Sequence, residues 1–262
     1  MSDARPLSVL NVSAYLFTHL PDAAQLRPVL RGRALDAGLR GTVILAEEGI
    51  NLFLAGDGHA VRGFVDALRA DPRFAALRTR ETWSATQPFG KMLVKLKAEI
   101  IRMDRPAIAP GRGRAPAVDP ATLRRWLDQG HDDAGREVVL LDTRNAFEID
   151  EGGFENAVDW GIDRFTQFPD AAARHRDALV GKTVVSYCTG GIRCEKAALV
   201  LRDEGIDAWQ LDGGILGWFA EAGQAHYRGD CVVFDDRRAV DSDLLPVRDP
   251  AGVGAVGPGP GR

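Results

Sequence analysis

The sequence feature that most constrains the fold is residues 184–196, where an apolar segment, a short glycine-containing loop and a helical segment follow one another directly. The β-forming residues at its start predict a buried strand, and the residues after the loop keep helical character up to Gly205. Cys188 therefore lies where a strand ends and a helix begins. Such a junction is typical of a parallel α/β sheet, in which ligands bind at the carboxyl ends of the strands.

The loop that follows this strand is predicted to hold an anion. Two successive glycines allow the backbone to curl, so that several N–H groups can point inward above the positive end of the helix dipole. We expect the Cys188 thiolate to be that anion and the catalytic nucleophile, with a lowered pKa and with Arg193 adding positive charge at the far rim. The predicted active-site loop continues with Thr189, Gly190, Gly191, Ile192 and Arg193.

The spacing of the cysteine and the arginine separates two kinds of chemistry. Cys188 and Arg193 form a Cys-x4-Arg pattern, one residue shorter than the Cys-x5-Arg loop with which protein tyrosine phosphatases surround a phosphate. A smaller ring fits the outer sulfur of a persulfide better than a tetrahedral phosphoryl group. In this loop the sequence resembles the rhodanese (sulfurtransferase) superfamily. The other interpretation of Cys188 is a small buried apolar residue.

Length and composition favour two domains in a reducing compartment. The chain has 262 residues with 45% hydrophobic content, enough for two domains of roughly 100 to 150 residues. Its first residues lack the features of a signal peptide, and no apolar run approaches the ~20 residues needed to span a bilayer. Three cysteines and five scattered histidines indicate neither a disulfide framework nor a metal site. We expect a cytoplasmic protein without a membrane segment, a metal or a bound cofactor.

The charges are distributed unevenly along the chain. Residues 1–118 hold 17 Lys and Arg against 11 Asp and Glu, a balance of +6. Residues 119–262 hold 16 against 26, a balance of −10, which brings the chain to −4. The positive half is where a polyanion would bind, although a solvated surface without a partner explains an excess of this size equally well.

The first domain is expected over residues 1–101. Its pattern runs strand, helix, two strands, helix and one or two final strands, which predicts a ferredoxin-like (acylphosphatase-like) α+β domain. In the first helix, Leu26, Val29, Leu30 and Leu35 are expected on one buried side. The predicted elements are strand 8–18, helix 22–38, strands 41–46 and 50–55, helix 58–70 and strand 91–100.

The strand predicted at residues 91–100 has the clearest alternation. Apolar residues occupy one of its faces, while Lys91, Lys95 and Lys97 occupy the other. We predict that these lysines bind phosphates along an open sheet face that Arg78 and Arg80 extend. A plain solvated strand is the alternative.

The second half of the chain has a different pattern. Residues 102–118, rich in proline, glycine and arginine, predict a linker. Strands then alternate with helices over residues 119–240, which predicts a rhodanese-like parallel α/β domain with strands at 138–142 and 208–211. Residues 241–262 turn to Pro, Gly and Val, and we expect a disordered tail there.

Four further residues are considered for a role near the loop, and two of them are candidates for supporting it. Asp142 and Arg144 follow one another at the end of a predicted strand, and we expect them to support the active site, with a structural role the commoner one for such a pair. Cys194 lies one helical turn behind the loop, where a buried structural thiol is favoured over a disulfide-forming partner. Cys231 falls in an apolar strand and is expected to be inert.

Seven separate stretches carry a closer resemblance: residues 41–51, 91–100, 142–145, 165–169, 187–196, 213–215 and 233–237. Together they resemble the rhodanese-domain tRNA uridine(34) hydroxylases over most of the chain. This resemblance implies oxygen-dependent hydroxylation of the wobble uridine to 5-hydroxyuridine, with Cys188 as the active-site cysteine. The sequence departs from the family at Leu52 and Phe53, where small polar residues are usual, and it lacks the cysteine-rich tail of some members.

The resemblance also implies a partner and a co-substrate. The basic first domain and the linker would grip the anticodon arm of a tRNA, with Lys91, Lys95 and Lys97 as candidate contacts and molecular oxygen as co-substrate. One alternative is a sulfurtransferase that carries a persulfide on Cys188 between a donor such as thiosulfate and an acceptor thiol. The other is a tRNA-binding or adaptor module without catalysis.

Overall fold

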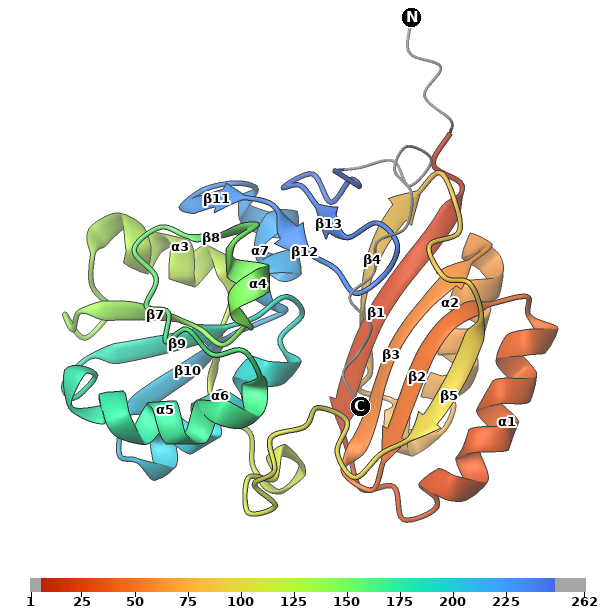
Figure 1. Cartoon of the computed structure of the whole chain (residues 1–262), viewed down its shortest axis with the longest axis horizontal. Helices are drawn as coiled ribbons and strands as arrows, with labels where there is room; N and C mark the ends of the chain where they lie inside the picture. Colours follow the sequence, from red (N-terminus) through yellow and green to blue (C-terminus); the bar gives the residue numbers. More distant parts are fainter. Residues whose placement is uncertain (1–5, 248–262) are drawn as a thin grey trace, which may run out of the picture.

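The first domain of the computed structural model, which describes residues 6–247, is a five-stranded sheet with two helices on one side (Figure 1). The strand order is β4-β1-β3-β2-β5, in which only β2 and β5 run parallel. This is the predicted ferredoxin-like arrangement with one added edge strand. The elements are β1 (Val9–Phe17), α1 (Ala23–Asp36), β2 (Arg40–Ala46), β3 (Gly49–Gly56), α2 (Gly58–Arg69), the 3-10 helix η1 (Pro72–Phe74), β4 (Arg78–Ser84) and β5 (Met92–Leu96).

Strand alternation divides the side chains of this sheet between two faces. Leu10, Val12 and Ala14 of β1 point into a core closed by α1 and α2, whereas the alternate residues Asn11, Ser13 and Tyr15 point to the other side. We call that other side the open face. Its side chains used below are Asn11, Ser13, Tyr15, Thr42, Asn51, Phe53, Arg78, Arg80 and Thr82.

Helix α1 buries a different stripe from the predicted one. Leu30 is buried as expected, but Val29 and Leu35 are 47% and 45% exposed, and Leu26 is only partly buried. The helix packs on the sheet through Leu30 together with the small residues Ala23 and Ala34. Small side chains allow the helix to approach the sheet closely. The hydrophobicity of an alanine does not show whether it is buried or exposed, so the sequence did not predict these contacts.

Strand β5 is shorter than the predicted strand 91–100. Its parallel pairing with β2 ends at the register Leu45↔Leu96, and Leu96 is already 39% exposed. The Lys97 N–H still donates to the Leu45 carbonyl at 2.9 Å, after which the chain leaves the sheet. Beyond this point Ile100 donates its N–H to the Glu48 carboxylate at 2.7 Å. The alternation of apolar and charged residues over 91–100 therefore continues beyond Leu96, where the strand itself ends.

The second domain is built on a four-stranded parallel sheet with the order β6-β10-β9-β7. Helices lie on both of its faces, so the expected parallel α/β architecture is present (Figure 1). The elements are η2 (Pro110–Arg112), β6 (Ala117–Val118), α3 (Pro120–Gln129), β7 (Val138–Asp142), α4 (Ala146–Ile149), β8 (Gly152–Phe154), η3 (Phe165–Gln167), α5 (Phe168–His175), η4 (Arg176–Ala178), β9 (Thr183–Tyr187), α6 (Ile192–Asp203), β10 (Asp207–Leu211), α7 (Gly214–Ala222), β11 (Tyr227–Gly229), β12 (Cys231–Val232) and β13 (Ala239–Val240).

The segment predicted as a linker packs against the second domain at several points. Met103, Ile108 and Ala115 are buried in its core, and β6 within this segment pairs with β10. At the other end, the first residues of the expected tail contact the second domain, since the Val247 N–H donates to the Ala239 carbonyl at 3.2 Å. The rest of the expected tail, residues 248–262, lies outside the described residues.

Buried ionic contacts join the two domains. The Lys196 ammonium on α6, 1% exposed, lies 2.9 Å from the Glu48 carboxylate and 2.6 Å from that of Glu99. From the segment between β12 and β13, Arg237 donates to the Thr82 hydroxyl at 2.7 Å. These contacts hold the open face toward the carboxyl end of β9, while α1 and α2 lie on the far side of the sheet (Figure 1).

Candidate active site

Cys188 directly follows β9, and the loop from Cys188 to Arg193, here the Cys188 loop, leads into α6. Gly191 has φ = 100°, and its N–H donates to Cys188 Sγ at 3.2 Å. A β-carbon at this position would lie 2.9 Å from the Tyr15 hydroxyl oxygen, so that both the backbone conformation and the close contact favour glycine. The curled loop with an inward-pointing amide is therefore present at the expected place.

The environment of Cys188 stabilises its thiolate. Burial by itself raises the pKa of the thiol, but the Cys194 side chain, the positive charge of Arg193 and the backbone N–H groups of both residues outweigh it and lower the pKa to about 5. Cys188 is accordingly anionic at neutral pH. Burial and the neighbouring Cys188 raise the pKa of Cys194, which remains a protonated, buried thiol.

Arg193, expected to add positive charge at the far rim of the loop, does so from a buried position. Its side chain is 6% exposed and pairs with both carboxylate oxygens of Glu148, at 2.5 Å and 2.7 Å. Burial raises the pKa of Glu148, but the hydrogen bonds and charge of Arg193 outweigh it and hold the pKa below its usual value. Sequence reasoning missed Glu148, because its partner is far away along the chain.

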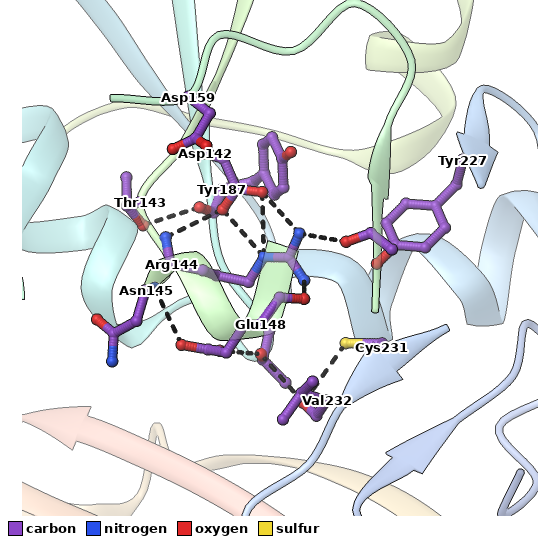
Figure 2. Close-up of polar contacts among 12 residues, drawn as sticks. Asp142, Thr143, Arg144, Asn145, Glu148, Asp159, Tyr187, Tyr227, Cys231 and Val232 are labelled. Carbon is purple, nitrogen blue, oxygen red and sulfur yellow. Dashed lines mark hydrogen bonds and ion pairs between the residues drawn. The ribbon is translucent and has the colours of Figure 1, made fainter. Parts of the chain in front are cut away.

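Asp142 and Arg144 lie behind the loop rather than in front of it. The Arg144 guanidinium binds both oxygens of the Asp142 carboxylate, with its shortest contact at 2.6 Å, and neither side chain is exposed by more than 1% (Figure 2). Arg144 also donates to the carbonyl oxygens of Glu148 at 3.2 Å and of Gly152 at 2.6 Å. The pair thus fixes the end of β7 to the segment that carries Glu148, which is a positioning role.

The other end of the loop is fixed by helix α7. The Ile215 N–H donates to the Cys188 carbonyl at 2.9 Å, and the Leu216 N–H donates to the Thr189 carbonyl at 3.0 Å. A β-carbon on Gly214 would lie 2.3 Å from the Cys188 carbonyl oxygen, so only glycine allows this close approach. The Gly-Gly-Ile stretch singled out in the sequence therefore packs directly on the Cys188 loop.

A cavity of about 910 Å³ lies between the two domains and reaches the Cys188 loop. The open face forms one of its walls, and Cys188, Thr189, Gly190, Ile192 and Arg193 line another. Cys188 has no solvent-exposed surface and lies at the bottom of the cavity.

The cationic residues that were predicted to bind phosphates do not all lie on the same surface. Lys97, Arg78 and Arg80 line the cavity, whereas Lys91 and Lys95 do not. Lys95 lies on β5 opposite Ile44, at the outer edge of the sheet. The predicted lysine row is therefore split, and only its last member shares a surface with Cys188.

Three side chains surround the space above the Cys188 loop. Tyr15 donates its hydroxyl to Glu195 at 3.1 Å, and the Phe234 ring lies 5.8 Å from the Arg193 guanidinium. Asn145, which precedes α4, lines the same cavity, and its buried amide oxygen has no hydrogen-bond partner among residues 6–247 (Figure 2). A buried acceptor without a hydrogen bond is unfavourable unless a ligand donates a hydrogen bond to it.

Cys231 takes no part in this arrangement. It is fully buried on β12, and burial raises its pKa to about 12. Within residues 6–247 we find no helix long and apolar enough to cross a bilayer. In the same part of the chain, no three or more His, Cys, Asp or Glu side chains are grouped so that they could hold a metal ion.

Comparison with family models identifies both domains. Residues 9–100 match the UPF0176 acylphosphatase-like domain, and residues 119–221 match the rhodanese-like domain. Together with the two sheets, these matches confirm the predicted fold class, an acylphosphatase-like α+β domain followed by a rhodanese-like α/β domain.

Curated relatives cover almost the whole chain. A tRNA uridine(34) hydroxylase from Variovorax paradoxus is 64% identical over 237 residues, which are 90% of each protein. The protein of the same name from Delftia acidovorans is 63% identical over 237 residues, again 90% of each. That from Bordetella avium is 60% identical over 242 residues, or 92% of this chain and 100% of the relative.

Two solved structures with similarity to the chain each cover less than half of it. A Saccharomyces cerevisiae homologue of single-domain rhodanese has 22% identity and a TM-score of 0.37, covering 44% of this chain and 88% of its own. An acylphosphatase from Coxiella burnetii has 16% identity and a TM-score of 0.26, covering 36% of this chain and 100% of its own.

Proposed function

The chain belongs to the tRNA uridine(34) hydroxylase family, and from this premise we propose that it hydroxylates C5 of the wobble uridine in tRNA, with molecular oxygen as co-substrate and the anticodon arm as binding partner. The observation that carries the proposal is the position of Cys188, a cysteine with a pKa of about 5 at the bottom of a cavity between two domains. Its volume of about 910 Å³ is near the upper end of the range of roughly 300–1,000 Å³ typical of small-molecule sites.

The proposed role of Cys188 is nucleophilic addition to the pyrimidine ring. In this step the Sγ–C6 bond forms and the C5=C6 π bond breaks, and the electron pair is held as an enolate that makes C5 nucleophilic. The addition is redox-neutral, and C5 becomes the atom at which oxygen reacts. One atom of O2 is added at C5, and an external two-electron donor reduces the other to water. The inward amide of Gly191 and the charge of Arg193 favour the thiolate as the resting state and as the leaving group.

Two features of the site fit a uracil base. The unpaired amide oxygen of Asn145 is available to accept the N3–H group of the ring. Cys188 has no exposed surface, so side chains beside it have to move before the base can reach its sulfur, and the aromatic rings of Tyr15 and Phe234 line the cavity beside the loop. We assign Asn145 to base recognition and the two rings to closing the site around the base.

The test is mass spectrometry of wobble nucleosides from a strain that lacks the gene, complemented with variants. Wild type is expected to restore 5-hydroxyuridine, Cys188→Ser to abolish it, and the matched control Cys231→Ala to restore it. If Cys188→Ser restores the modification to the wild-type level, Cys188 is not the reacting residue and the proposed mechanism is wrong. If wild type itself restores none, the proposed reaction is wrong.

Sulfur transfer through a Cys188 persulfide is the second candidate function. The observation that favours it is the Cys-x4-Arg loop itself, whose inward Gly191 amide would also stabilise a terminal persulfide sulfur. Cyanolysis of the purified protein with thiosulfate separates the two functions. Rapid production of thiocyanate supports the sulfurtransferase, and absence of thiocyanate supports the hydroxylase.

A further inference from the structure

One row of side chains crosses the open face next to the cavity. In the register of the sheet, Arg80 on β4 lies opposite Ser13 on β1, Ser13 lies opposite Phe53 on β3, and Phe53 lies opposite Thr42 on β2. The neighbours of Phe53 along this row are therefore small and polar, so that its ring stands above them. Phe53 is partly exposed, lines the cavity, and has no aromatic partner in the part of the chain that the structure describes.

Two cations at opposite edges of this surface have no partner among the residues that the structure describes. Most arginines of the cavity wall are paired, as shown by Arg114 with Glu195 at 2.6 Å and Arg78 with Asp212 at 3.2 Å. By contrast, Arg80 and Lys97 form neither a hydrogen bond nor an ion pair within residues 6–247. A cation that lines a cavity without an internal partner is available to an anionic ligand.

The spacing of these two cations suits a strand of nucleotides rather than one phosphate. Arg80 belongs to β4 at one edge of the sheet, and Lys97 follows β5 at the other edge. Four inter-strand steps of about 4.8 Å separate the two edges by roughly 19 Å, and Lys97 lies beyond Leu93, the β5 residue opposite Thr42, so the two cations are at least that far apart. The Arg80 guanidinium is also held against the second domain, because a β-carbon on Gly213 would lie 2.0 Å from its Nη2 atom.

We propose that this surface, from Arg80 through Phe53 to Lys97, binds the single-stranded nucleotides next to the target uridine. A base stacks on Phe53, and phosphates bind Arg80 and Lys97. Aromatic side chains on the open face of a small sheet stack bases in other RNA-binding domains, and stacking tolerates any base because each has a π face. The inference rests on the proposed function for the identity of the RNA, and it adds where the neighbours of the reacting base bind.

Stacking on Phe53 requires an unpaired base, so the loop of the anticodon arm is the part that enters the cavity. Phe234 lines the same cavity and is 50% exposed, so it offers the entering strand a second aromatic surface. A base-paired stem would have its bases covered by their neighbours and would leave Phe53 without a contact. The surface therefore selects single-stranded RNA over duplex RNA.

The test is direct binding of a fluorescent anticodon stem-loop RNA to the full chain over a series of salt concentrations. Phe53→Ala and Phe53→Leu are both expected to weaken binding about 10-fold, because leucine keeps an apolar side chain but offers no ring for stacking. Arg80→Ala and Lys97→Ala are each expected to lower the slope of log affinity against log salt by about one, as the loss of one phosphate contact does.

Matched controls lie away from the cavity. Phe147→Leu alters an aromatic ring that is 54% exposed on α4, and Arg33→Ala removes an exposed arginine on the helix side of the first domain. Both are expected to bind like wild type. Circular dichroism and urea unfolding of each variant show that it is folded.

The outcomes separate this inference from the proposed function. Wild-type affinity in both Phe53 variants, or an unchanged salt slope in both Arg80→Ala and Lys97→Ala, overturns the inference even when wild type makes 5-hydroxyuridine. RNA binding with the expected losses supports the inference even when no 5-hydroxyuridine forms, in which case only the proposed function fails. A duplex RNA that binds as tightly as the stem-loop and is equally sensitive to Phe53→Ala also overturns it.

Discussion

The Cys188 loop and the open face line the same cavity, but they differ in how completely their polar groups are paired. In the loop, Cys188 accepts the Gly191 amide, and Arg193 binds both oxygens of Glu148. On the open face side, Arg80 and Lys97 lack internal partners within residues 6–247. A region whose polar groups are all paired keeps a fixed geometry, which catalysis needs. Polar groups without a partner remain free to bind a ligand.

The largest expected effect comes from breaking the buried pairing behind the loop. Glu148→Ala leaves the buried Arg193 charge without its carboxylate partner and should lower the free energy of unfolding by about 3–5 kcal/mol. Urea unfolding measures this loss. In the matched control Glu155→Ala, which removes an exposed ion pair with Arg228, the loss should stay below about 1 kcal/mol. Equal losses in the two variants would contradict the assigned role of Glu148.

A smaller effect is expected where the two regions are joined. Lys196→Met unpairs the carboxylates of Glu48 and Glu99, which are 21% and 17% exposed and so are partly compensated by water. We expect a loss of about 2–3 kcal/mol in urea unfolding, together with weaker RNA binding because the open face is no longer held over the loop. Lys182→Met, which removes an exposed pair with Glu137, is the control and should lose less than about 1 kcal/mol. Stability and RNA binding that both match the control would mean that this contact does not position the domains.

The smallest effect is expected on the sheet itself, outside the cavity. Lys95→Ala removes an exposed charge at the outer edge that does not line the cavity, so RNA affinity should change by less than about twofold. Lys91→Ala should behave in the same way, whereas Lys97→Ala should weaken binding. Comparison of the three affinities at one salt concentration checks this. A larger loss in Lys95→Ala than in Lys97→Ala would place the RNA on the outer edge.

The same contrast explains how much could be predicted from the sequence. The Cys188 loop is encoded locally: β-forming residues, two glycines and a helical segment follow one another, and the strand 138–142 matches β7 (Val138–Asp142). The partner of Arg193 could not be predicted, because Glu148 reaches it only through the packing of α4 beside the sheet. An i,i+3 pattern of asparagine and glutamate at a helix start was the one local signal that could have drawn attention to Glu148.

In the first domain, the alternation of apolar and polar residues predicted which side chains share a face of the sheet. It did not predict where strand β5 ends. Lys95 and Lys97 were grouped by their spacing, yet β5 ends at Leu96, and only Lys97 turns toward the cavity. The end of the strand is set by the length of its partner β2, which is a tertiary property. Likewise, Phe53 first stood out as a departure from the family, and its proposed role follows only from the placement of the sheet beside the second domain.

The most direct test of the account is the pH dependence of Cys188 alkylation by iodoacetamide in the intact protein. Arg193 lies between Cys188 and Cys194, so trypsin separates the two thiols and mass spectrometry follows each one. The account predicts a rate at Cys188 that rises with a midpoint near pH 5 and is constant around pH 7, with no reaction at Cys194 over that range. A midpoint at Cys188 between about pH 8 and 9, the range of an ordinary thiol, would contradict it.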